Sequence, residues 1–110
     1  MNRCKTLIAA MAVSFAASLP AHAECVLPPP PSKIPDGNTA TEQEMLAAMQ
    51  TLKQYDGDVN VYLKCLEFEA KQNRVSRSEQ ERLHNNAVDQ LQRIANKFNE
   101  QVRVFKARQG

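Results

Sequence analysis

The stretch that decides the fold is Thr41 to Gln72, TEQEMLAAMQTLKQYDGDVNVYLKCLEFEAKQ. Its apolar residues recur at alternating spacings of three and four, which is the pattern of a helix with one apolar face. These positions are Met45, Ala48, Leu52, Tyr55, Val59, Tyr62 and Leu66. We therefore predict a helix over 41–72, with a single apolar seam on which the rest of the chain packs.

The start and the continuity of this helix follow from a few residues. Thr39-x-x-Glu42 and Thr41-x-x-Glu44 both fit a capping box, in which a hydroxyl and a carboxylate satisfy free backbone N–H groups. Gly57 interrupts the pattern, and a glycine costs about 1 kcal/mol relative to alanine inside a helix. Because the seam keeps its phase through Gly57, we expect a continuous helix. A break at residues 56–58 is the alternative.

A second amphipathic run predicts a helix over 78–107, after a short polar connection at 73–77. Ser76-x-x-Glu79 and Ser78-x-x-Glu81 offer capping boxes for its start. Its apolar positions are Leu83, Ala87, Leu91, Ile94, Phe98, Val102 and Phe105. If the chain folds back at the connection, the two seams oppose each other in register, with Leu52 against Phe98.

The fold class predicted from these runs is all-α: an antiparallel, coiled-coil-like two-helix hairpin over residues 41–110. The charges agree with it, because residues 24–70 hold eight acidic and three basic side chains, whereas residues 71–110 hold four acidic and nine basic ones. Each exposed pair between the helices contributes under about 1 kcal/mol. Tyr55 and Tyr62 are expected in the core, with their hydroxyls reaching its edge.

Residues 1–23 have the features of a secretory signal peptide. Arg3 and Lys5 precede an apolar segment at 7–19, and Ala21-His22-Ala23 is a small-residue cleavage site. We expect cleavage after Ala23 and a periplasmic or secreted protein. Without this segment the chain holds 12 basic and 12 acidic residues. That balance argues against nucleic acid as a partner, and no other apolar segment is long enough for stable membrane insertion.

Two cysteines, Cys25 and Cys65, remain after removal of the signal peptide. An even count in an exported protein favours a disulfide, and we expect the bond within one chain. A disulfide-linked dimer and two free thiols are the alternatives. The bond would fasten a proline-rich arm, residues 24–40, whose four consecutive prolines at 28–31 favour an extended conformation.

The arm is long enough to fold back along the first helix. From Cys25 to Thr41 it spans about 50 Å at 3.1 Å per residue, and the helix from Thr41 to Cys65 rises about 36 Å. Asp36-Gly37 predicts a turn between the two. Val61, Cys65 and Phe68 share one side of the helix, so we expect the arm to cover Val61 and Phe68, which form a candidate interaction stripe.

Residue patterns typical of catalysis are missing from the sequence. His84 is the only histidine after residue 23, so it lacks the further ligands that a zinc site needs. Glu67 and Glu69 point in different directions on a helix, which argues against an acid–base pair. We predict no catalytic residues, no cofactor and no metal site, and therefore no enzyme.

The combination of Cys25, the proline run, Ile34-Pro35-Asp36-Gly37, Glu44-Met45, Tyr55 and Tyr62-Leu63-Lys64-Cys65-Leu66 resembles a group of small exported proteins of Gram-negative bacteria. That group is functionally uncharacterised. The resemblance covers roughly residues 25–66. It implies export and the pairing of the two cysteines, and it implies no activity.

Two functional hypotheses follow. The first is an exported, non-enzymatic interaction protein, such as an adaptor, inhibitor or accessory subunit, that presents a helical surface to an envelope protein. The second is a structural homo-oligomer in which two hairpins form a four-helix bundle, because one hairpin leaves Leu46, Met49 and Leu63 only partly covered.

Overall fold

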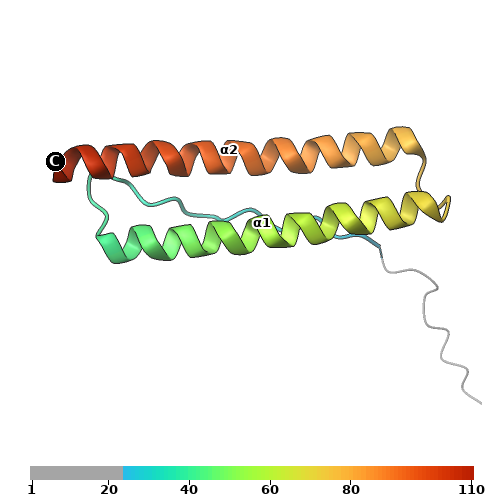
Figure 1. The fold of residues 1–110 in the computed structure, drawn as a ribbon, viewed down its shortest axis with the longest axis horizontal. Coiled ribbons are helices and arrows are strands. Elements are labelled where there is room, and N and C mark those ends of the chain that lie inside the picture. The colour runs from blue at the N-terminus through green and yellow to red at the C-terminus, as the bar shows by residue number, and fades with distance from the viewer. Residues whose placement is uncertain (1–23) are drawn as a thin grey trace, which may run out of the picture.

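The computed structural model describes residues 24–110, and two long antiparallel helices make up most of that part (Figure 1). Helix α1 spans Glu42–Lys71 and helix α2 spans Arg77–Gln109. Residues 24–40 form neither helix nor strand and run alongside the helices. The predicted antiparallel hairpin is therefore confirmed. The proposed signal peptide, residues 1–23, lies outside the described residues.

Helix α1 begins with a complete capping box at the second of the two predicted positions. The backbone N–H of Glu44 donates to Thr41 Oγ1 at 3.1 Å, and the backbone N–H of Thr41 donates to Glu44 Oε2 at 2.8 Å. Thr41 itself has an extended backbone. The helix therefore begins at Glu42, one residue after the predicted start.

The turn between the helices closes α1 with a Schellman motif. Asn73 takes a left-handed conformation with φ of 57°. The backbone N–H groups of Asn73 and Arg74 donate to the carbonyls of Ala70 and Glu69, both at 3.0 Å. These bonds satisfy carbonyl groups that the end of a helix otherwise leaves unpaired. Asparagine is one of the few residues that adopt this backbone conformation readily.

Helix α2 starts at Arg77 because Ser76 provides the cap. Ser76 Oγ accepts a hydrogen bond of 3.1 Å from the backbone N–H of Glu79. The Glu79 carboxylate binds Arg82 instead of completing the box, with contacts of 2.5 and 2.9 Å. Compared with the predicted range 78–107, the helix is longer at both ends.

Gly57 lies inside α1 without breaking it, so the prediction of a continuous helix is confirmed and the alternative break at 56–58 is wrong. The residue is exposed, and a Cβ placed on it would meet nothing within 4 Å. The glycine therefore has no steric role within the hairpin.

The core consists of two apolar clusters along the line where the helices meet. One contains Tyr55, Val59, Tyr62, Leu66 and Ala87, and the partly buried Leu52, Leu63, Leu83, Leu91 and Ile94 pack against it. The other contains Ala40, Met45 and Phe98, with the partly buried Ile34, Ala48, Met49, Leu52, Val102 and Phe105. Residues that face each other in the predicted register, such as Leu52 and Phe98, fall in the same cluster, as an antiparallel hairpin requires. Leu52 packs against both clusters and so connects them.

Candidate interaction surfaces

The arm is bonded to α1 at its start by a disulfide between Cys25 and Cys65, whose Cα atoms lie 5.7 Å apart. The bond lies within one chain, which confirms the predicted pairing. Cys25 packs against the core cluster that contains Tyr62 and Leu66. The disulfide therefore places the start of the arm beside the core.

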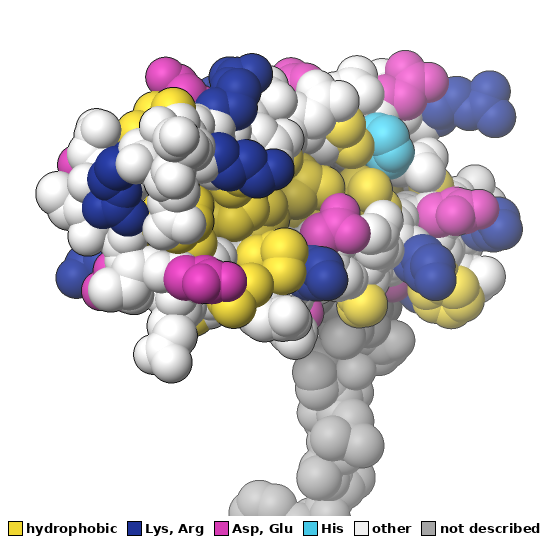
Figure 2. Space-filling model, turned by 60° about the vertical axis from the view of Figure 1, so that its left-hand side comes forward, with side chains coloured by type: hydrophobic (Ala, Val, Ile, Leu, Met, Phe, Trp, Pro, Cys, Tyr) yellow, Lys and Arg dark blue, Asp and Glu magenta, His cyan; other side chains and the backbone are white. Residues whose placement is uncertain are grey.

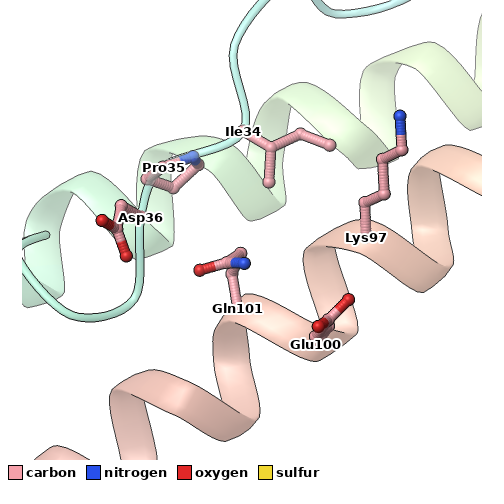
Figure 3. Close-up of a pocket in the computed structure, with 6 residues that line it drawn as sticks. All are labelled: Ile34, Pro35, Asp36, Lys97, Glu100 and Gln101. Atoms are coloured by element: carbon pink, nitrogen blue, oxygen red, sulfur yellow. The ribbon is translucent and has the colours of Figure 1, made fainter.

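The other end of the arm is fixed on α2 by a close backbone contact at Gly37. A Cβ at this position would collide with the carbonyl oxygen of Gln101 and lie 2.8 Å from the backbone nitrogen of Phe105. The Gly37 N–H donates to Gln101 Oε1 at 2.8 Å. Figure 3 shows Gln101 projecting from α2 toward the segment that carries Pro35 and Asp36. Only glycine fits here, for reasons of space and not because of a left-handed backbone.

Arg108 holds the turn that follows Gly37. Its guanidinium donates to the carbonyl of Asn38 at 2.7 Å and to that of Ala40 at 2.6 Å. The turn closes on itself, because Asp36 Oδ1 accepts from the N–H of Asn38 at 2.9 Å. The last turns of α2 thus determine where the arm ends and α1 begins.

Between these two ends the arm is held by apolar contacts. Within the described chain, residues 24–35 make no hydrogen bond to the helices. Ile34 packs against the cluster that contains Met45 and Phe98. Shallow hollows under the prolines are lined from α1 by residues such as Tyr55 and from α2 by residues such as Ile94. The arm therefore lies along the groove between the helices and contacts both of them.

This path corrects one prediction: the arm does not cover the stripe formed by Val61 and Phe68. Val61 is 69% exposed and Phe68 is 54% exposed, although the disulfide is formed. Instead, Cys25 and Ile34 of the arm pack against the two core clusters in the groove. Val61 borders one shallow hollow together with arm residues such as Val26 and Pro28, and Val26 is itself exposed.

Five large hydrophobic residues remain exposed in the part of the chain that the structure describes. They are Val26, Leu27, Leu46, Val61 and Phe68. All five belong to the arm or to α1, and none of those found in residues 24–110 belongs to α2. Val26 and Val61 border the same hollow, and exposed apolar side chains that adjoin one another are typical of contact sites.

A second apolar surface lies between the helices. Figure 2 shows hydrophobic side chains gathered in a hollow, with charged side chains along both of its sides. Met49 and Leu63, which the sequence places beside the seam, are half-buried, and Leu46 is exposed. A single hairpin therefore leaves part of its seam accessible.

The hairpin turn carries an ion pair that sequence reasoning missed. The Arg74 guanidinium donates to both carboxylate oxygens of Glu69, at 2.6 and 3.0 Å, and lies 5.5 Å from the ring centre of Phe68. The hydrogen bond to Glu69 raises the pKa of Arg74. Glu69 is only 8% exposed, in accord with the rule that buried charges are paired. The sequence feature that indicates this arrangement is Asn73. Asparagine adopts a left-handed backbone conformation readily, and this conformation turns the chain back over the end of α1.

The Tyr55 hydroxyl does not reach the edge of the core, which corrects the sequence expectation for this residue. It is buried without a hydrogen-bond partner in the described structure, and burial raises the pKa of Tyr55. The reason is the arm, because Pro29 and Pro31 border the same hollow as Tyr55.

The described residues form neither a metal site nor a membrane-spanning helix. No group of three or more His, Cys, Asp or Glu side chains in residues 24–110 is arranged to hold a metal ion, and His84 is exposed. Neither α1 nor α2 is long and apolar enough to cross a membrane. In the comparisons with known proteins, no family model, no curated protein and no solved structure matches this chain.

Proposed function

We propose that this chain is an exported, non-enzymatic interaction protein that presents the outer side of α1 to a protein partner in the periplasm. The interaction stripe of Val61 and Phe68 is the centre of this surface. The arm and the disulfide hold the hairpin together, so that α1 can leave one side uncovered. Helix α2 supplies the opposite half of the core and fixes the turn of the arm.

One observation carries this proposal: the exposed large hydrophobic residues of the described chain all belong to the arm or to α1. An apolar side chain left in water loses the roughly 1.5–3 kcal/mol that burial of a Val, Leu or Phe provides. Five such residues beside one helix suggest a surface that a partner covers. Helix α2 serves as the internal comparison, because its outer side is polar.

Site-specific photo-crosslinking in cells tests the proposal. A photoreactive amino acid is placed at Val61, at Phe68 and, as a control, at Asn96, which is exposed on α2. We expect a discrete protein adduct from the first two positions and none from the third. Adducts of equal yield from all three positions would contradict a specific docking side, and mass spectrometry would identify the protein bound.

The second candidate function is a structural homo-oligomer in which two hairpins form a four-helix bundle. The apolar hollow between the helices favours it (Figure 2). The half-buried Met49 and Leu63, which the sequence places beside the seam, would supply contacts. Light scattering after size-exclusion chromatography would give twice the monomer mass for such a bundle. Met49→Glu would dissociate it, whereas contacts on the outer side of α1 would survive this substitution.

A further inference from the structure

We propose that the partner of the outer side of α1 is a second copy of this chain, with the two α1 helices antiparallel and crossing at Gly57. This inference rests on the proposed function, because it names the partner of the same surface. We define the outer face of α1 as Leu46, Gln50, Gly57, Val61 and Phe68, which are all exposed. Their spacings of four and seven place them on one side of the helix.

Gly57 is the first reason for placing the crossing at this point. Glycine destabilises the interior of a helix relative to alanine. The hairpin offers no steric reason for it, because an added Cβ would meet nothing within 4 Å. A helix without a Cβ at one exposed position lets a second backbone approach closely there. Gly57 is therefore the point of the outer face at which another helix fits most closely.

The second reason is that Leu46 and Phe68 of the outer face lie symmetrically about Gly57. Leu46 lies eleven residues before Gly57 and Phe68 lies eleven residues after it. Each is therefore about 16 Å from the crossing at 1.5 Å per residue. An antiparallel pair brings Leu46 of each copy onto Phe68 of the other. Leu46 is 50% exposed and Phe68 is 54% exposed in the isolated hairpin, so both gain burial.

The charges favour the antiparallel arrangement over the parallel one. Glu42 lies fifteen residues before Gly57 and Lys71 lies fourteen after it. An antiparallel crossing places Glu42 of one copy near Lys71 of the other at both ends of the contact. A parallel crossing would place like charges together. Such pairs at the rim set orientation more than affinity, and a two-fold contact of this kind is the commonest arrangement in homo-oligomers.

A charge-rescue experiment tests the register of this dimer. Sedimentation velocity is run on the oxidised chain, as processed by the cell, over a range of concentrations. Phe68→Glu and Leu46→Lys should each raise the dimer dissociation constant by about a hundredfold, because each places an unpaired charge in an apolar contact. The double variant should return it to within about tenfold of the original value, because the new charges face each other.

Three further variants accompany the rescue. Leu46→Lys combined with Asn96→Glu has the same charges, but residue 96 is exposed on α2, outside the contact, so no rescue is expected. Gly57→Gln should raise the melting temperature of the dilute monomer and at the same time weaken the dimer. Asn96→Gln on α2 makes a smaller gain in helix propensity and should leave the dimer unchanged.

The outcomes separate this inference from the proposed function. A chain that stays monomeric up to about 1 mM, or a dimer indifferent to Gly57→Gln and without charge rescue, overturns the inference. If that monomer still forms a crosslink from Phe68 to another protein, the proposed function stands and only the inference fails. A chain with neither a dimer nor a crosslink overturns both.

Discussion

The N–H of Gly37 donates to the side-chain oxygen of Gln101 at 2.8 Å, at a point where the arm touches the backbone of α2. The residues are far apart in the sequence, and their contact positions both the arm and the start of α1. It also depends on the missing side chain, because any Cβ at residue 37 would strike the α2 backbone. The arm is therefore an integral part of the fold.

Gly37→Ala should destabilise the protein by about 1–3 kcal/mol, the typical cost of forcing extra atoms into a packed site. The methyl group collides with backbone and not with a flexible side-chain end, so relaxation is expensive. Urea unfolding followed by circular dichroism measures the change.

The matched control for that prediction is Gly57→Ala, measured at low protein concentration. This methyl group enters open space on a helix, so a stabilisation of about 1 kcal/mol is expected. If Gly37→Ala stabilised the protein as Gly57→Ala is expected to, the close contact at Gly37 would be wrong.

The register of the hairpin can be tested at Leu52 and Phe98, which share one core cluster. Leu52→Ala and Phe98→Ala should each destabilise by about 2–5 kcal/mol, as buried large-to-small substitutions do. Their effects should not add in the double variant, because the two side chains share packing partners. Strict additivity in the unfolding free energies would argue for a different register.

Removal of the disulfide should weaken the fold without dissolving the helices. The bond closes a loop with a sequence separation of 40 residues, which corresponds to a stabilisation of roughly 3–4 kcal/mol in the chain-entropy model. The double variant Cys25→Ser, Cys65→Ser should melt at a lower temperature and keep most of its helical signal at room temperature. Circular dichroism melting measures both quantities.

Amide exchange adds a second readout to that experiment. Because Val61 and Phe68 are exposed while the disulfide is formed, their side chains need no reduction to become accessible. Loss of the disulfide should therefore increase exchange at the hydrogen-bonded turn of the arm, residues 37–40, and under the arm near Tyr55, more than around Phe68. Increased exchange around Phe68 alone would mean that the arm covers the stripe in solution.

Tyr55→Phe should stabilise the protein, because it removes a buried hydroxyl that has no partner. An unsatisfied buried polar group costs about 1–3 kcal/mol, and about 1 kcal/mol of this should be recovered. Tyr62→Phe, at a neighbouring core position, is the control. Thermal or urea unfolding at neutral pH measures the change. A clearly destabilising Tyr55→Phe would refute the assignment of the Tyr55 hydroxyl as buried without a hydrogen-bond partner.

The same hydroxyl gives a pH dependence with a defined sign. Burial raises the pKa of Tyr55 above the ordinary value of 10.0. As the pH rises, the Tyr55 hydroxyl therefore ionises in the unfolded chain before it does in the folded protein. Its contribution to the free energy of unfolding is fully present below pH 10 and is lost as the pH rises through the pKa of Tyr55 in the folded protein. The original protein should lose more stability above pH 10 than Tyr55→Phe does, as measured by urea unfolding at pH 9 and above.

The sequence by itself determined the two helices, their antiparallel pairing and the cysteine pair. These features depend on local periodicity and on short-range rules. Spacings of three and four residues define an apolar seam, and a Thr41–Glu44 capping box fixes one end of a helix. The continuity of α1 through Gly57 was also determined locally, because the seam keeps its phase there.

Only the tertiary structure decided where the arm lies, and with it which surfaces stay open. The length of the arm allows a path over the outer side of α1 as well as a path along the groove. The groove is preferred because it lets Ile34 and Cys25 bury surface against both core clusters and because Gly37 fits against α2. Burial of Tyr55 and exposure of Val61 and Phe68 both follow from that choice, which depends on packing between residues distant in the sequence.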